Sequence, residues 1–143
     1  MGDDKTRVFE AGEMASWSEF RLRVPGLPPA AKCFLKDRIG LNGMEVSLNA
    51  MQPGQAVPFV HRHRSNEELY IFLSGDGEFQ ADGKTFPIRA GSCIRCAPEV
   101  RRSWRNSGKS ELIFVVIQAP NQAMATSLIQ DGELVEEPLC WDA

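Results

Sequence analysis

The chain has 143 residues, of which 43% are hydrophobic and 24% are charged, and its net charge is −3. This composition is typical of one ordinary globular domain that can bury a sizeable core. The weak acidity, with a pI of about 5.4, gives no support for nucleic-acid binding. The longest apolar run, residues 112–117, is far too short to cross a bilayer, so we expect no membrane partner.

The N-terminus and the cysteines bear on the compartment. The first residues are acidic and lack the apolar segment of a signal peptide, which predicts a cytoplasmic protein with reduced thiols. Cys93 and Cys96 have the CxxC spacing of redox motifs and zinc sites. In a strand, however, positions i and i+3 face opposite sides, so these two sulfurs are not expected to share a ligand.

Short strands punctuated by Gly, Pro and Asp run through most of the chain. Alternating apolar and charged residues over 20–24, before a Pro-Gly pair, predict one edge strand. The strands predicted after it are 31–36, 44–51, 57–63, 68–74, 77–81, 84–88, 92–97, 102–106 and 111–118. Turn signals about 8–12 residues apart indicate an all-β, antiparallel barrel or sandwich. The segment 121–130 is a candidate for one short helix.

We predict one barrel domain, residues 31–120, with an N-terminal extension (1–30) and a C-terminal extension (121–143). Several large hydrophobic residues of the two extensions predict docking rather than disorder, and we expect the C-terminal extension to pack on the barrel. They are Phe9, Trp17, Leu128, Leu134 and Trp141. The predicted strand 68–74 is apolar on both faces, and a single small barrel would cover only one of them. Either the N-terminal strand or a second subunit would close the other face, and we expect a homodimer.

The most informative feature is His61-Arg62-His63, followed five residues later by Glu68; these are the only two histidines in the chain. Side chains two apart on a strand leave the same face with Cα atoms roughly 6.5–7 Å apart, so both imidazoles can converge on one point. Imidazole and carboxylate together suit zinc, iron, nickel or manganese. The alternative is two surface histidines and a solvated glutamate, but the neighbouring strand and turn signals favour a shared site.

These residues resemble the first motif of the cupin superfamily, small β-barrels with two short metal-binding motifs. That motif runs Gly, five residues, His-x-His, three or four residues, Glu, six residues, Gly. Here Gly54 is followed by six residues before His61, and six residues separate Glu68 from Gly75. Glu67 is the alternative carboxylate, but it would leave seven residues before that second glycine.

The resemblance covers residues 44–118 and implies a cupin-like antiparallel barrel or jelly roll. It also implies one divalent transition metal (Fe, Ni, Mn or Zn) held by His61, His63 and Glu68. Such a set of two histidines and one carboxylate leaves coordination positions open, as catalytic rather than structural metal sites do.

The second family motif is degenerate in this chain. Gly91 and Asn106 keep its register, but Arg102 stands where the family has a histidine ligand. A guanidinium has no lone pair to donate, and at ~6 Å it would repel a divalent ion by about 5–6 kcal/mol for an effective dielectric near 20. Three arrangements remain: Arg102 points away, an anionic ligand bridges the metal and Arg102, or there is no metal and Arg102 pairs with Glu68.

The leading hypothesis is a metal-dependent cupin that acts on a small anionic metabolite bound by Arg102. Dioxygenase chemistry is favoured over isomerase or decarboxylase chemistry, and Tyr70 or Glu67 is the candidate base. The second hypothesis is a non-catalytic small-molecule binding or sensor barrel, with or without metal. Four aromatic residues are expected to line the pocket, namely Phe59, Phe72, Trp104 and Phe114. A pocket filled by their side chains would favour a structural or vestigial site.

Overall fold

The computed structural model of the protein describes residues 5–141, so the outermost residues of both predicted extensions lie outside the described part. In chain order the elements are the 3-10 helix η1 (Met14–Glu19), β1 (Ala31–Phe34), the helix α1 (Lys36–Ile39), β2 (Glu45–Met51), β3 (Asn66–Ser74), β4 (Asp76–Ala81), β5 (Lys84–Arg89), β6 (Cys93–Cys96), β7 (Arg102–Arg105) and β8 (Leu112–Pro120). Among the described residues, no helix is both long and apolar enough to cross a membrane.

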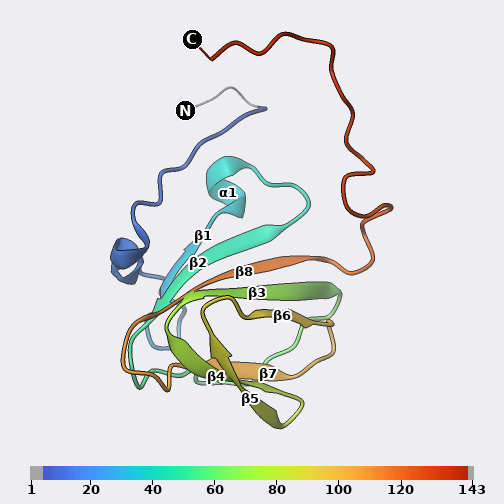
Figure 1. Cartoon of the computed structure of the whole chain (residues 1–143). Helices are drawn as coiled ribbons and strands as arrows, with labels where there is room; N and C mark the ends of the chain where they lie inside the picture. The colour runs from blue at the N-terminus through green and yellow to red at the C-terminus, as the bar shows by residue number, and fades with distance from the viewer. Residues whose placement is uncertain (1–4, 142–143) are drawn as a thin grey trace.

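Two antiparallel sheets form the body of the molecule (Figure 1). The larger sheet has the strand order β1-β2-β8-β3-β6, and the smaller sheet has the order β5-β4-β7. Alternation along each strand turns one set of side chains toward the space between the sheets, as expected for a sandwich. The predicted all-β jelly-roll class is therefore confirmed, and the two sheets stay separate rather than closing into one hydrogen-bonded barrel.

The main core lies between the sheets and is rich in aromatic rings. The Tyr70 ring packs edge-on against Phe79 and Trp104, with ring centroids 5.0 and 4.9 Å apart. Phe72 contacts Phe114 at a centroid distance of 5.3 Å. The buried members of this core are Tyr70, Phe72, Phe79, Ile88, Cys96, Trp104, Leu112, Phe114 and Val116.

The N-terminal extension covers the outer face of the larger sheet over β1, β2 and β8. Trp17 of η1 is 7% exposed and packs in a second core with Cys33, Leu48, Ala50 and Ile113. The outer face of β3, which was also expected to be covered, is less protected: Leu69 and Ile71 are half-buried and Leu73 is exposed. The predicted homodimer, which would cover this face, stays a prediction.

Two predicted strands are only extended segments with isolated bridges. Residues 57–63 contact β7 through the isolated bridge His61↔Arg102 and through the Val57 amide, which donates to the Trp104 carbonyl at 3.0 Å. Residues 20–24 pair through the isolated bridge Leu22↔Ala30. Pro58 interrupts the first of these segments, and because proline has no amide hydrogen it cannot donate to a continuous ladder.

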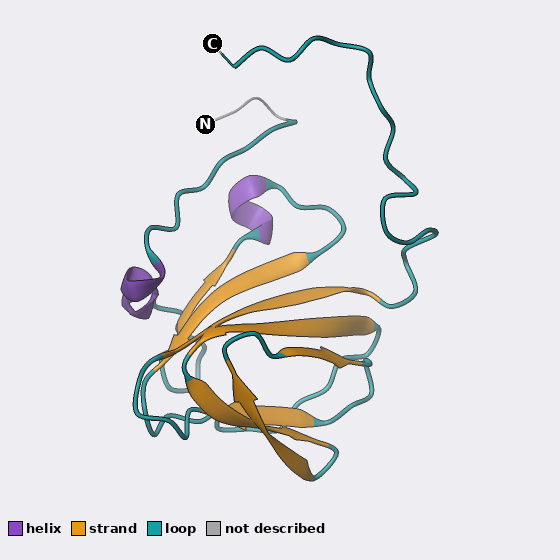
Figure 2. Cartoon of the chain, viewed as in Figure 1, coloured by secondary structure: helices purple, strands orange, loops and turns teal. Residues whose placement is uncertain are grey.

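The C-terminal extension differs from the sequence-based expectation in two ways. Residues 121–130 form turns and bends instead of a helix, since an isolated segment this short is marginal as a helix in water. Residues 121–141 lie as a loop outside the sheets (Figure 2), and Leu128, Leu134 and Trp141 are 93%, 99% and 85% exposed. In the single chain this extension therefore does not pack on the barrel, because scattered apolar residues without a strand or helical period present no common face.

Candidate metal centre

The site is assembled from the extended segment before β3 and from β3 itself. The His61 amide donates to the Arg102 carbonyl at 3.1 Å, and the Arg102 amide donates back at 3.0 Å. The His63 amide donates to the Pro98 carbonyl at 2.9 Å. These bonds fix the backbone on both sides of the two histidines, and Glu68 is the third residue of the adjoining strand β3.

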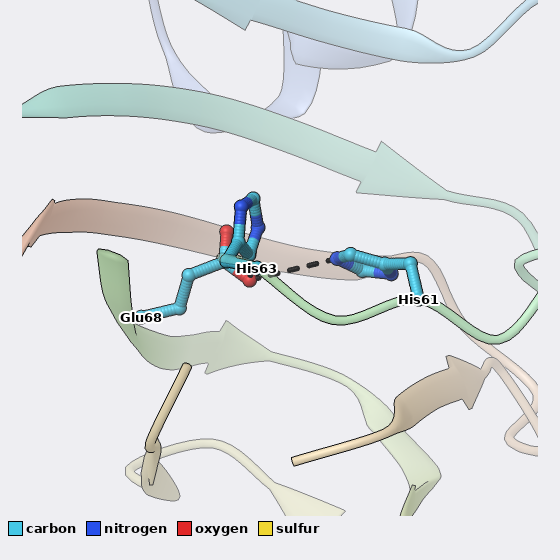
Figure 3. A group of neighbouring side chains, drawn as sticks. All are labelled: His61, His63 and Glu68. Carbon is cyan, nitrogen blue, oxygen red and sulfur yellow. Dashed lines mark ion pairs between the residues drawn. The ribbon is translucent and has the colours of Figure 1, made fainter. Parts of the chain in front are cut away.

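The side chains of His61, His63 and Glu68 point toward one another (Figure 3). The Nε2 atoms of His61 and His63 lie 3.6 and 3.2 Å from Glu68 Oε1. One candidate ligand atom from each residue lies within 4.8 Å of the others. The three side chains expected to share a site are thus brought together, although an extended loop rather than a regular strand presents the histidines.

Glu68 is held in its ionised form. The residue is 5% exposed, and burial alone would raise the pKa of its carboxyl group. Contacts with the side chains of His61, Tyr70 and Arg102, together with the charge of His63, outweigh that effect and lower the pKa to about 2. A carboxylate that stays ionised across the physiological pH range is ready to ligate a cation.

Glu67, the alternative carboxylate, belongs to a different environment. Arg95 Nε donates to its Oε1 at 3.0 Å, and both side chains are more than a third exposed. Neighbouring residues on a strand face opposite sides, which separates Glu67 from Glu68. The metal-capable group contains Glu68, and Glu67 is engaged in a surface ion pair away from the two histidines.

Arg102 and Tyr70 hold the Glu68 carboxylate in place through hydrogen bonds. Tyr70 Oη donates to Glu68 Oε1 at 2.6 Å, Arg102 Nη2 donates to the same oxygen at 2.8 Å, and Arg102 Nε donates to Tyr70 Oη at 3.2 Å. Arg102 Nη1 donates to the carbonyls of Pro98 and Val100. Arg102 therefore pairs with Glu68, as the third expected arrangement has it, and this pairing leaves the two histidines beside the same carboxylate.

This placement bears on two of the sequence-predicted roles. Arg102 is 0% exposed and does not line the cavity, so the structure does not bring it to the position of a substrate-binding residue. Burial and the charge of Glu68 raise the pKa of Tyr70 far above its ordinary value. Tyr70 therefore stays protonated and acts as a hydrogen-bond donor, which differs from the predicted catalytic base.

A cavity of about 1210 Å³ opens beside the three residues. Its walls include His61, His63 and Glu68 together with three of the four predicted aromatic residues: Phe59, Trp104 and Phe114. Phe72 was expected there too, but it is fully buried in the core further along β3. The aromatic side chains border the cavity without filling it, which favours small-molecule binding over a vestigial site.

Sequence reasoning missed further polar residues of the cavity wall, among them Lys32 on β1, and Ser47 and Asn49 on β2. Lys32 pairs with Asn49 in the β1–β2 ladder, and Lys32 Nζ donates to Ser47 Oγ at 3.1 Å. Ser47 and Asn49 are 1% and 2% exposed. The available signal was the period of two in β2, where Ser47 and Asn49 alternate with the apolar residues of the outer face.

The donor set fits a divalent transition metal. His63 Nε2 is buried and is not aligned for a hydrogen bond, although it lies 3.2 Å from Glu68 Oε1. Tyr70 and Arg102 both donate to Glu68 Oε1, the same oxygen that lies beside the two histidines, so a metal would share this carboxylate with them. Two imidazoles and one carboxylate suit iron, nickel, manganese and zinc, and the ligands alone do not distinguish among them.

Comparison with known proteins agrees with this fold. The family model of the cupin domain matches residues 47–118, which is half of the chain. The chain therefore belongs to the cupin family.

Individual relatives share part of the chain. It is 33% identical over 67 residues to an oxalate-binding protein of Thermotoga maritima, covering 47% of this chain and 54% of that protein. It is 30% identical over 82 residues to the polyketide synthase CurC of Streptomyces cyaneus, covering 57% and 53%. The chain thus spans about half the length of these curated relatives. Among solved structures, a cupin protein from Bacteroides fragilis is 34% identical with a TM-score of 0.69, covering 79% of this chain and 96% of that one.

Proposed function

We propose that the protein binds one divalent transition metal through His61, His63 and Glu68, and that the metal holds a small anionic metabolite. The observation that carries this proposal is the position of the three ligand atoms, which converge at the wall of a cavity of about 1210 Å³. Three protein ligands leave coordination positions open, and the adjoining cavity gives a ligand room to reach them.

The residues around the centre have separable roles in this proposal. A bound metal supplies a Lewis acid that polarises a ligand oxygen. Glu68 supplies the negative charge, and Tyr70 and Arg102 fix its carboxylate through Oε1. Because all three nitrogens of the Arg102 guanidinium donate to protein atoms, the anion is expected at the metal and not at Arg102.

The relatives support the anionic class of ligand. The Thermotoga maritima protein that is 33% identical to this chain is an oxalate-binding protein. Oxalate is a small dicarboxylate whose oxygens can bind a metal directly, which makes it a suitable first probe for this cavity.

For the reaction, we propose oxidation by dioxygen ahead of isomerisation or decarboxylation. Two histidines and one carboxylate with open positions form the ligand set of non-heme iron(II) oxygenases. The high pKa of Tyr70 removes one candidate base for proton-transfer chemistry. Binding without reaction is the second candidate function, and the observation in its favour is that Arg102, a buried cation paired with Glu68, stands where the second family motif has a histidine ligand.

The test is a titration of oxalate into chelator-treated protein before and after loading with Mn²⁺. We expect oxalate to bind the loaded protein at least tenfold more tightly, and we expect the gain to disappear in the variant His61→Ala/His63→Ala. Equal affinity with and without metal would contradict the proposal. Oxygen uptake by the Fe²⁺-loaded protein with small carboxylic acids, absent in the same double variant, then separates oxidation from simple binding.

A further inference from the structure

Lys32 is a cation on the cavity wall that the metal centre does not use. It belongs to β1, whereas Glu68 belongs to β3, and β2 and β8 lie between them in the sheet. Three steps of about 4.8 Å between neighbouring strands place the two backbones roughly 14 Å apart. Both side chains nevertheless line the same cavity, so one ligand can face both.

The Lys32 ammonium has few partners for a half-buried charge. It donates to Ser47 Oγ, and it lies 5.3 Å from the centroid of the Phe34 ring. Among residues 5–141 it forms no ion pair with a carboxylate. An ammonium carries three donors, so one neutral hydroxyl leaves most of its hydrogen-bonding capacity for another molecule.

The surrounding residues hold the ammonium in place. Ser47 Oγ accepts from Lys32 Nζ at 3.1 Å and from Asn49 Nδ2 at 3.0 Å. Asn49 Nδ2 also donates to the carbonyls of Ser47 and Phe114. Because Ser47 and Asn49 are almost completely buried, this small network is part of the sheet and is not a flexible surface contact.

Burial makes this charge costly in the free protein. It lowers the pKa of Lys32 to about 8, and the charges of Glu68 and Glu45 offset only part of the effect. A desolvated cation without a carboxylate partner gains strongly when an anion arrives. The cavity wall therefore has the properties of a binding position for an anionic group.

We propose that Lys32 is the second anion-binding group of this cavity, so that the ligand carries two anionic groups, one at the metal centre and one on the Lys32 ammonium. This inference rests on the proposed metal centre and narrows its ligand class to dianions such as dicarboxylates. Ser47 acts as a positioning residue for the ammonium.

The test uses Mn²⁺-loaded protein and straight-chain dicarboxylates from oxalate to adipate. Each diacid is compared by calorimetry with its own monoamide, which has nearly the same shape and one charge fewer. We expect at least one diacid to bind tenfold or more tightly than its monoamide. In Lys32→Met the two affinities are expected to fall within about twofold of each other, with Mn²⁺ affinity unchanged, whereas Lys32→Arg keeps the preference.

Lys36→Met is the matched control, because it removes the same charge from an exposed position nearby that does not line the cavity. Its preference for the diacid is expected to equal that of the wild type. The inference is overturned if Lys32→Met retains the preference, or if no diacid is preferred by the wild type. Failure of the wild type to bind Mn²⁺ overturns the proposed function as well, and the metal titration identifies that case.

Discussion

Glu68 is the residue on which the centre depends, because one carboxylate joins the two histidines to the buried pair of Tyr70 and Arg102. Its Oε1 atom lies within 3.6 Å of the Nε2 atoms of His61 and His63 and accepts hydrogen bonds from the other two side chains. The Arg102 guanidinium therefore holds the Glu68 carboxylate in place and also competes with a metal for the negative charge of that carboxylate.

Removal of the Glu68 charge is expected to destabilise the metal-free protein. Glu68→Gln leaves the Arg102 guanidinium buried without a counter-charge, which costs about 3–5 kcal/mol. The double variant Glu68→Gln/Arg102→Met replaces both charges and should recover most of that loss. The measurement is the free energy of unfolding in urea, and equal stability of the wild type and the single variant would show that the pair is not buried as described.

Residue patterns predicted the ligands of the centre better than its surroundings. Side chains two residues apart point the same way in any extended segment. The prediction that His61 and His63 share a site therefore holds, although residues 57–63 do not form a regular strand. Lys32 was missed because a polar residue in a strand is ordinarily assigned to the solvent face. Arg102 was recognised as exceptional, but its partners come from segments distant in sequence, and spacing alone does not reveal them.

At the level of elements, the period of two along the strands was sufficient to predict most of the two sheets. It failed where backbone chemistry overrides side-chain pattern, as at Pro58, and where exposed apolar residues such as Leu128 and Leu134 were taken as evidence of packing. The pairing of β7 with β4 positions part of the site, because β7 carries Arg102 and Trp104 on its inner face.

Close approach of β4 to β7 gives a prediction at this level. A Cβ atom at Gly77 would lie 2.4 Å from the Arg105 carbonyl oxygen, so Gly77→Ala must push the two strands apart. We expect a loss of about 1–3 kcal/mol in the free energy of unfolding. Gly43→Ala is the control, because a Cβ atom there meets nothing within 4 Å, and its effect should stay within about 0.5 kcal/mol. Equal effects of the two substitutions would contradict the pairing.

For the whole molecule, the ionised Glu68 predicts a pH dependence of stability. Its pKa is about 2 in the folded protein and 4.5 without perturbation, so the unfolded chain binds the proton first as the pH falls. The stabilisation is complete above about pH 4.5 and is lost as the pH falls toward 2, amounting to about 3 kcal/mol. The metal-free wild type should lose this much more stability than Glu68→Gln/Arg102→Met between pH 5 and pH 2. Parallel pH profiles would rule the shift out.

The C-terminal extension allows a second test at the scale of the whole molecule. Residues 122–141 are all exposed in the single chain, whereas Asn121 still bonds to Ser65 and Arg95. Deletion of residues 122–143 should therefore change Tm by no more than about 2 °C. A larger decrease, or a change in oligomeric state, would show that this extension docks on a second copy of the chain.

The central claim is that His61, His63 and Glu68 hold a metal, and metal content tests it most directly. Untagged protein purified without chelators, and then incubated with each of Fe²⁺, Ni²⁺, Mn²⁺ and Zn²⁺, is analysed by elemental mass spectrometry beside His61→Ala/His63→Ala. The account predicts close to one transition-metal ion per chain in the wild type and a loss of at least tenfold in the variant. Wild-type protein that takes up none of the four ions, or a variant that retains them, would contradict the account.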